Sequence, residues 1–329
     1  MDNREDSHRR ESAQDRIPPW FQKWWIALRP FALPASSMSV VFGSVLAVTI
    51  GGAPFDLPLF LAALLGMVFL HTGGNLLNDV FDYKKGIDRQ VNPVSGAVVR
   101  GWIGPRDALV AGGLFLLLGS ILGIYIVSRV GMSILWIGAA GVAIGVLYTW
   151  GPYPLKFNAL GDLAVFLNFG ILGALGAWTV QTGVPSWTPV MWAVPMSMLV
   201  VGILHANNWR DMASDTSGGI RTVANLLGET ASHVYYVLLI LGPFAVILLL
   251  ILLSWAFDLT PRMPLTFLVT FLALPLAAKR LKMAANRHQS GHVQNFLALD
   301  GATAQLNLLF GMLSTAALLL HAAVLHWLT

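Results

Sequence analysis

The sequence predicts an all-α, polytopic membrane protein in which about nine transmembrane helices form one bundle. Of its 329 residues, 56% are hydrophobic and only 11% are charged, and the mean hydropathy is +0.68. Soluble domains carry about 25% charged residues. The chain therefore lacks the polar surface that soluble domains of this total length would need. A second observation agrees, because apolar stretches of membrane-spanning length recur along the chain.

Nine apolar segments define the predicted helices, and each is long enough to cross about 30 Å of hydrocarbon as an α-helix. They cover residues 28–50, 57–78, 107–128, 132–150, 159–181, 187–207, 231–254, 263–283 and 303–327. Residues 1–23 lack the apolar centre of a signal peptide. We expect them to form a disordered cytoplasmic tail with a short amphipathic lead-in at WFQKWW, whose tryptophans suit the membrane interface. Residues 24–329 are then the transmembrane domain.

The distribution of basic residues predicts the orientation. With nine spans, 18 of the 20 Lys and Arg residues fall on one side of the membrane, and only Arg129 and Arg262 fall on the other. Cytoplasmic loops carry an excess of basic residues, so we expect the N-terminus on the cytoplasmic side of an inner or cytoplasmic membrane. This topology accounts for the net charge of +4, and we expect no nucleic-acid partner.

Two acidic clusters follow the second and the sixth predicted helix. Asn78 and Asp82 in the first cluster share the spacing Asn-x3-Asp with Asn207 and Asp211 in the second, and Asp215 adds a further step of four. Residues four apart lie on one helix face. A charged run in a cytoplasmic loop is usually a solvated surface. Two runs with the same spacing on the same side favour a function instead.

Such oxygen-rich stripes suit Mg²⁺, which takes one or two carboxylates together with substrate phosphates. Two opposed stripes could hold Mg²⁺ ions that bridge a diphosphate, and basic side chains would neutralise the remaining oxygens. The candidates are Lys84, Lys85, Arg89, Lys156, Arg210 and Arg221. A polyprenyl diphosphate would explain the membrane, because its tail belongs in lipid. The chain has no cysteine, which excludes a cysteine nucleophile, thiolate metal ligands and disulfides.

The stretches NDVFDYKKGID and NNWRDMASDTSGGIRTVANLLG resemble the two aspartate-rich motifs of the UbiA superfamily of membrane prenyltransferases. The resemblance covers nearly all of the chain beyond the tail, including LRPFALP and YTWGPYPLKFNALGD. It implies a nine-helix bundle that binds Mg²⁺ and an isoprenyl diphosphate, with an aromatic acceptor as the second substrate and the site on the cytoplasmic side.

The resemblance also implies roles for individual residues. The implied metal ligands are Asp82, Asp88, Asp211 and Asp215. The implied catalytic residues are Asp82, Asp211, Asp215 and Lys156. The implied substrate-binding residues are Asn78 and Asn207, together with Tyr153 and the basic residues Lys84, Lys85, Arg89, Arg210 and Arg221.

One departure from the family pattern concerns the acceptor. Many members space the first motif Asn-x3-Asp-x3-Asp, whereas Asp82 and Asp88 here are six residues apart with Gly86 between them. Six helical steps turn a residue by about 600°, so Asp88 leaves the face of Asp82 unless the helix ends first. Gly86 suits such an end. The sequence DYKKGID is similar to the first motif of the branch that prenylates 1,4-dihydroxy-2-naphthoate in menaquinone biosynthesis. This resemblance makes 1,4-dihydroxy-2-naphthoate the favoured acceptor.

Other functions stay open. Within the class, the acceptor could be 4-hydroxybenzoate, homogentisate, a haem or chlorophyll precursor, or a lipid alcohol. From another class, a secondary transporter of an anionic metabolite is the alternative. Inverted-repeat transporters bind near the membrane midplane, whereas both clusters here lie at one boundary; parallel-repeat transporters remain compatible with the pattern. A nonenzymatic scaffold would leave the matched aspartates unexplained. His71 and His205 are interpreted as packing residues.

Overall fold

The computed structural model describes residues 19–85, 96–289 and 293–328, and within these ranges the chain folds into helices with a single isolated β-bridge. The long elements are α3 (Pro34–Thr49), α4 (Leu57–Lys85), α5 (Pro105–Val130), α6 (Met132–Thr149), α10 (Val194–Arg210), α12 (Val223–Ala256, broken at Gly228) and α15 (Leu299–Leu328). The shorter elements are α2 (Trp20–Leu28), η1 (Pro30–Ala32), η2 (Leu155–Phe157), α7 (Gly161–Val165), η3 (Phe166–Leu172), α8 (Gly173–Thr182), α9 (Trp187–Trp192), α11 (Met212–Ser217), η4 (Leu265–Ala273), α13 (Leu274–Ala285) and α14 (Val293–Leu297).

The all-α membrane fold is confirmed, but the count of nine spans is not fully reached. Seven helices within the described ranges are long and apolar enough to cross a membrane, and there are eight if α2 with η1 and the following α3, bent by 49°, count as one span. The predicted span 263–283 is divided between η4, a 3-10 stretch of 9 residues, and α13, of 12 residues. Neither piece is long enough by itself to cross the hydrocarbon.

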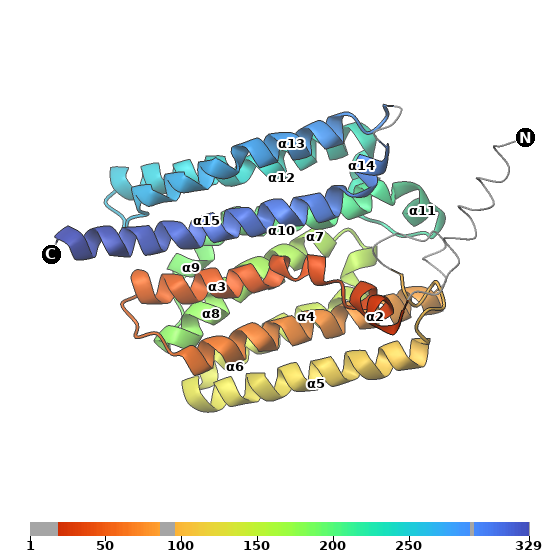
Figure 1. Ribbon diagram of the computed structural model, residues 1–329, viewed down its shortest axis with the longest axis horizontal. Helices are drawn as coiled ribbons and strands as arrows, with labels where there is room; N and C mark the ends of the chain where they lie inside the picture. Colours follow the sequence, from red (N-terminus) through yellow and green to blue (C-terminus); the bar gives the residue numbers. More distant parts are fainter. Residues whose placement is uncertain (1–18, 86–95, 290–292, 329) are drawn as a thin grey trace, which may run out of the picture.

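The long helices run alternately up and down the bundle, so that α4 and α10 point the same way and finish at the same end (Figure 1). The short helices α11 and α14 lie at this end too, and we call it the motif end. The two basic residues expected on the other side lie at the opposite end, Arg129 in the last turn of α5 and Arg262 in the loop after α12. The bundle therefore separates the basic residues as the sequence predicts.

The centre of the bundle is formed by α3, α8, α10 and α15, which pack against one another. The approach of α3 to α8 is especially close, because a Cβ on Gly43 would lie only 2.3 Å from the carbonyl oxygen of Ala174. Small residues allow this kind of backbone contact between membrane helices. By contrast, α5 and α6 leave most of their apolar side chains exposed. In a membrane protein this outer surface faces lipid.

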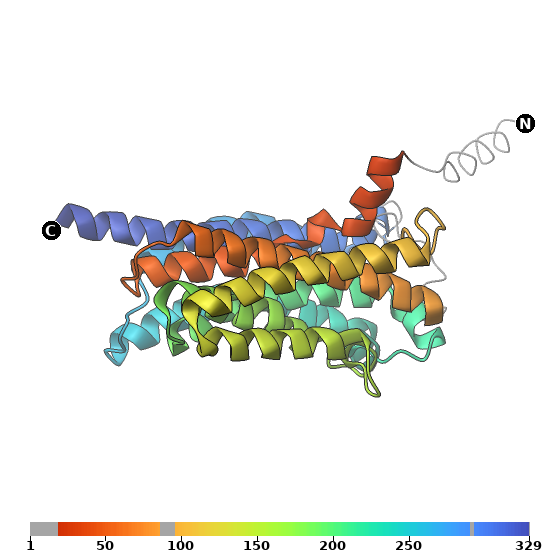
Figure 2. The same cartoon turned by 90° about the horizontal axis from the view of Figure 1, so that it is seen from below.

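The beginning of the described chain departs slightly from the predicted boundary. The tail was expected to reach residue 23, but α2 begins at Trp20; residues 1–18 lie outside the described ranges. Figure 2 shows α2 projecting from the motif end of the bundle. Its side chains Trp20, Phe21 and Trp25 are exposed. Such an aromatic helix suits the membrane interface. The helix ends at Arg29, whose backbone is left-handed (φ 50°) and turns the chain into η1.

Candidate active site

The first aspartate motif occupies the last turns of α4, where two of its side chains contact the connection between α6 and α7. Thr149, at the end of α6, donates a hydrogen bond to Asn78 Oδ1. Lys156 Nζ lies 2.5 Å from Asp82 Oδ1, and the two side chains are only 13% and 17% exposed. The i, i+4 spacing of Asn78 and Asp82 places both on the helix face that meets this connection.

The local structure around Lys156 explains how its side chain reaches Asp82. Pro154 precedes a single 3-10 turn, Leu155–Phe157, and Asn158 Nδ2 donates a hydrogen bond to the carbonyl oxygen of Pro154 at 2.8 Å. The Lys156 ammonium also lies 4.8 Å from the centre of the Phe157 ring. Proline fixes its own backbone angle, and the side-chain bond closes the turn, so Lys156 is held toward α4.

A second ion pair lies beside the first. Asp79 is 1% exposed, and its Oδ1 lies 2.5 Å from Arg29 Nη2. A buried carboxylate needs such a partner, because desolvation penalises an unpaired charge. From the sequence, Arg29 bears only on the topology, and Asp79 is a residue that supports the predicted metal ligands without belonging to them. The stretch LRPFALP, in which Arg29 lies, was the available signal.

The second aspartate motif spans the junction of α10 and α11 and is organised by Arg210. Its Nε and Nη2 donate to the two carboxylate oxygens of Asp211 at 2.9 and 2.8 Å. Nη2 also donates to Asn207 Oδ1 at 2.5 Å, and Nη1 donates to Asp300 Oδ2 at 2.9 Å. Asp215 follows one turn later in α11, with its backbone N–H bonded to the Asp211 carbonyl oxygen. Arg210 thus connects the motif to the first turn of α15.

Backbone hydrogen bonds join the two halves of the site. The N–H of Arg221, beyond the second motif, donates to the carbonyl oxygen of Phe157 at 3.1 Å, and the N–H of Ala159 donates to the carbonyl oxygen of Arg221 at 2.8 Å. Asn158 and Arg221 form the isolated parallel bridge. The turn that carries Lys156 to Asp82 is therefore fastened to the loop after Asp215. The two motifs are therefore connected through the backbone at the motif end.

The remaining residues predicted for the site are placed less centrally or lie outside the described ranges. Lys84 and Arg221 are exposed, and the Tyr153 side chain is 59% exposed. Asp88 and Arg89, and the side chain of Lys85, are not among the described residues. Tyr148, next to the end of α6, is less exposed than Tyr153 and interacts electrostatically with Asp82.

The two helix histidines differ from each other. His71 Nδ1 lies 2.7 Å from Ser36 Oγ, and its ring stacks on Phe169 with 4.4 Å between centres. The packing role expected of His71 is confirmed. His205 is also buried, but its Nδ1 has no hydrogen-bond partner among the described residues. Tyr148, Asp300 and Asp162, which lies near His205, are the other polar residues here that sequence reasoning left without a role.

The donor chemistry fits Mg²⁺. Within the described residues no three Asp, Glu or His side chains lie close enough to hold a metal by themselves. Asp82 and Asp211 nevertheless supply one hard carboxylate from each motif, and Asn78 and Asn207 place amide oxygens one turn before them. Mg²⁺ binds through one or two carboxylates and completes its coordination with water and substrate phosphates. These residues fit that mode better than a site formed by protein alone.

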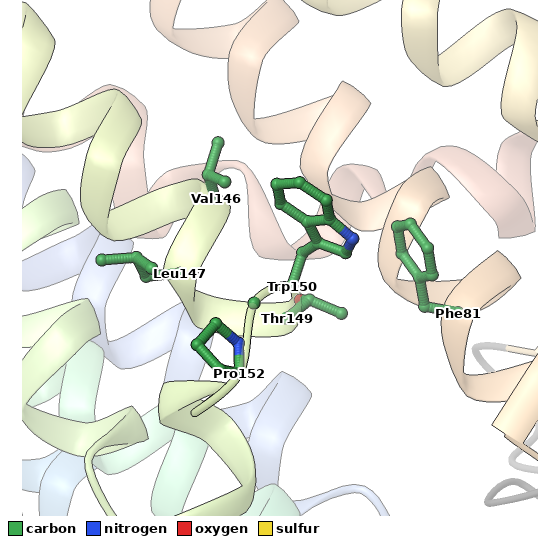
Figure 3. Close-up of a pocket in the computed structure, with 7 residues that line it drawn as sticks. Phe81, Val146, Leu147, Thr149, Trp150 and Pro152 are labelled. Atoms are coloured by element: carbon green, nitrogen blue, oxygen red, sulfur yellow. The ribbon is translucent and has the colours of Figure 1, made fainter.

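An apolar groove of about 530 Å³ opens beside the first motif (Figure 3). It is lined by Phe81, Val146, Leu147, Thr149, Trp150, Gly151 and Pro152. Phe81 comes from α4 and the other side chains from the end of α6 and the loop that follows. Since Phe81 precedes Asp82 and Thr149 contacts Asn78, the groove brings an apolar surface next to the charged site.

Comparison with known proteins identifies the family. The model of the UbiA prenyltransferase family matches residues 37–299. Proteins named UbiA prenyltransferase domain-containing protein 1 are similar to this chain. The one from Xenopus tropicalis is 32% identical, with 91% of this chain and 82% of the relative covered. The one from Homo sapiens is also 32% identical, with 94% and 88% covered.

Solved structures agree on the fold. A UbiA homolog from Archaeoglobus fulgidus, bound to GPP and Mg²⁺, gives a TM-score of 0.58 at 16% identity over 89% of this chain and 99% of that chain. A structure described as digeranylgeranylglyceryl phosphate synthase gives 0.54 at 16% identity over 92% and 99%. The expected superfamily is confirmed, while the relatives' names do not specify the naphthoate branch. On the family match and the identity to these relatives, the chain belongs to the UbiA prenyltransferase family and is a prenyltransferase of the membrane.

Proposed function

We propose that this enzyme transfers a prenyl group from a polyprenyl diphosphate to the ring of 1,4-dihydroxy-2-naphthoate, with Mg²⁺ as its cofactor, as a step of menaquinone biosynthesis. One observation carries the proposal. Each aspartate motif holds a carboxylate against a basic side chain, Asp82 against Lys156 and Asp211 against Arg210, and both pairs lie at the same end of the bundle.

A site for a metal diphosphate contains both carboxylates and basic side chains. When no substrate is bound, these groups can neutralise one another by pairing, as they do here. Asp82 and Asp211 would hold Mg²⁺, with Asp215 and Asp88 as the further ligands implied by the motifs. Lys156 would then exchange Asp82 for a diphosphate oxygen, so that neither charge is left unpaired in a mostly buried place. A related protein of the same fold is described as bound to GPP and Mg²⁺, and again to DMAPP and Mg²⁺, which supports the assignment.

The chain's residues would favour departure of the diphosphate by charge. Bound Mg²⁺ neutralises charge on the leaving group, and Lys156 adds a preorganised cation in a site with little solvent. Breaking the allylic C–O bond leaves a carbocation that an electron-rich ring can attack. The surrounding helices exclude water, which would otherwise capture the cation. No nucleophilic side chain is required.

The acceptor rests on two arguments. The DYKKGID spelling of the first motif is similar to the naphthoate branch, and a ring with two hydroxyls is electron-rich enough to capture an allylic cation. The apolar groove lined by Phe81 and Trp150 supports the proposal, because it offers an apolar substrate a surface next to Asp82. We also propose that this site faces the cytoplasm, on the basis of the basic residues gathered at the motif end.

The test is turnover by the purified protein with geranyl diphosphate, Mg²⁺ and a panel of acceptors, followed by mass spectrometry of the products. We expect prenylated naphthoquinol from the dihydroxynaphthoate, no product in EDTA, and none from Asp82→Asn or Asp211→Asn. Loss of one charge-stabilising group reduces rates by about 10²–10³, and loss of a metal ligand should reduce them further. Full turnover in EDTA or in either variant would contradict the metal assignment. Prenylation of 4-hydroxybenzoate alone would contradict the acceptor.

A further inference from the structure

Asp162, in the first turn of α7, is a buried carboxylate without a basic partner. Three aspartates are buried among the described residues: Asp79, Asp162 and Asp300. Asp79 and Asp300 each lie within 2.9 Å of an arginine nitrogen. The nearest basic group to Asp162 is His205, whose Nδ1 is 4.0 Å from Oδ2. Asp162 is 6% exposed, and neither of its carboxylate oxygens makes a hydrogen bond of good geometry within the described ranges.

The imidazole of His205 is oriented so that it cannot donate to Asp162 while it is neutral. Its Nε2 lies 3.1 Å from the carbonyl oxygen of Ser232. A carbonyl oxygen only accepts, so Nε2 carries the hydrogen, and the neutral ring presents a bare Nδ1. That Nδ1 is the atom that faces Asp162 and has no hydrogen-bond partner among the described residues. Two hydrogen-bond acceptors, Nδ1 of His205 and Oδ2 of Asp162, thus face each other, and one proton can be shared between them.

Aromatic hydroxyls complete the surroundings of Asp162. The ring of Tyr235 meets His205 edge to face at 4.7 Å, and its hydroxyl is directed at Asp162. Tyr148 interacts electrostatically with Asp162 and with Asp82. A Cβ on Gly161, next to Asp162, would lie 3.6 Å from the Lys156 Cα and 3.7 Å from the Tyr148 ring. The start of α7, which carries Asp162, therefore packs against the turn that carries Lys156.

Packing alone gives no reason for this arrangement. An unsatisfied buried polar group destabilises a fold by about 1–3 kcal/mol, and by more when the group is charged. Buried ionisable groups in membrane proteins mark functional sites by default. Asp79 and Asp300 show that this bundle pairs an aspartate with arginine where the role is structural. Asp162 has no such basic partner; the groups that face it are the Tyr235 hydroxyl and Nδ1 of His205.

We propose that Asp162 is the base that removes the proton from the acceptor's hydroxyl, with His205 beside it to share that proton. This inference rests on the proposed function. The hydroxyl O–H bond breaks and the proton forms an O–H bond with Asp162, which leaves a phenolate. The phenolate's electrons form the new bond from the ring carbon to the allylic carbocation, which is left when the C–O bond to diphosphate breaks and the diphosphate keeps that bond's electron pair.

With an acceptor that loses CO₂, Asp162 returns to its ionised state at the end of each turnover. The attacked ring carbon then carries a carboxylate next to a ketone, and loss of CO₂ returns the electron pair to the ketone oxygen as a phenolate. That oxygen takes the proton back from Asp162, so the side chain ends as it began and no proton needs a path to water. A base enclosed at 6% exposure suits this cycle. It suits less well an acceptor that loses a ring proton, because that proton would have to be exported.

The test compares Asp162→Asn with wild-type enzyme and with Asp107→Asn, a control that removes an exposed carboxylate in the first turn of α5. Two acceptors are used: 1,4-dihydroxy-2-naphthoate and a ring-fluorinated analogue whose hydroxyl is more acidic. Removal of a general base lowers rates by about 10²–10⁴-fold. With 1,4-dihydroxy-2-naphthoate, we expect the kcat of Asp162→Asn to be lower than that of wild type by that factor. With the fluorinated analogue, most of this difference in kcat should disappear. The KM of Asp162→Asn for geranyl diphosphate should stay unchanged, and Asp107→Asn should match wild type.

Each outcome decides between the claims. If wild-type enzyme prenylates neither acceptor, the proposed function fails. If wild type is active and Asp162→Asn equals it, or loses both acceptors equally, the assignment of Asp162 as base is overturned while the prenyl transfer stands. If the asparagine variant does not fold, Asp162→Glu is used, which moves the carboxylate by one methylene. The kcat of Asp162→Glu should fall, and the loss should again be smaller with the more acidic acceptor. An unchanged kcat overturns the assignment.

Discussion

Lys156 and Asp82 form an ion pair of 2.5 Å across 74 positions of the sequence, between the turn after α6 and the end of α4. The same turn is bonded through its backbone to Arg221, beyond the second motif. Lys156 therefore lies on the turn that connects the two aspartate motifs. A change at this residue should affect catalysis rather than only stability.

Lys156→Gln is expected to lower kcat by about 10²–10³-fold, the loss typical of one preorganised charge in an active site. The exposed pair Arg262–Asp258 at the opposite end, with side chains 46% and 76% exposed, supplies the control. Arg262→Gln should leave turnover unchanged, since exposed pairs contribute about 0–1 kcal/mol. Steady-state assays in detergent would measure both variants. Equal turnover by Lys156→Gln and wild type would remove Lys156 from the mechanism.

Asp300→Ala should destabilise the bundle. The substitution leaves Arg210, which is buried and bonded to Asp300 at 2.9 Å, without the partner that ties α10 to α15. Removing one member of a buried ion pair costs about 3–5 kcal/mol. Thermal unfolding in detergent should show a clearly lower Tm than for Asp107→Ala, which removes an exposed carboxylate. Indistinguishable Tm values would mean that the pair adds nothing to stability.

Gly43→Ala should also destabilise the fold, because its Cβ would meet the carbonyl oxygen of Ala174 at 2.3 Å. Overpacking of this kind costs about 1–3 kcal/mol, and here backbone would have to move. Gly138→Ala in α6 is the matched control, since nothing lies within 4 Å of its Cβ. Alanine favours a helix over glycine by about 1 kcal/mol, so this control should be neutral or stabilising. A tolerated Gly43→Ala would contradict the close contact of α3 and α8.

The topology can be tested by labelling, because the chain has no native cysteine. Ser217→Cys, after the second motif, should react with a membrane-impermeant thiol reagent from the cytoplasmic side. Val184→Cys, in the exposed loop before α9, should react only from the other side. This follows from the basic residues at the motif end. Labelling of both positions from one side would contradict the arrangement of α10 across the bundle.

Much of this architecture was available from the sequence because two signals are strong and local. Membrane-length apolar runs located the helices, and the repeated Asn-x3-Asp spacing located both motifs. The division of 263–283 into η4 and α13 was not predictable, since hydropathy does not distinguish a 3-10 from an α-helical backbone. The aromatic stretch WFQKWW indicated the helix that begins at Trp20, although the predicted domain boundary at residue 24 falls four residues inside it.

The partners of the site residues were beyond local patterns. Arg210 is bonded to Asp300 across 90 positions, and no spacing rule joins residues that far apart. Asp162 lies near the start of the predicted span 159–181, and the packing of α7 against α10 buries it. Tyr148 and Tyr153 are equivalent in the sequence, yet the end of α6 at Thr149 leaves one inside and the other exposed.

The central claim, prenyl transfer to a dihydroxynaphthoate, is tested most directly with an acceptor labelled in its carboxyl carbon. The purified protein is incubated with this acceptor, geranyl diphosphate and Mg²⁺, and released CO₂ is counted against prenylated product. The account predicts one labelled CO₂ for each prenyl group transferred, and a product that has lost the acid. A prenylated product that keeps its labelled carboxylate, or no transfer to this acceptor while another aromatic ring is prenylated, would contradict it.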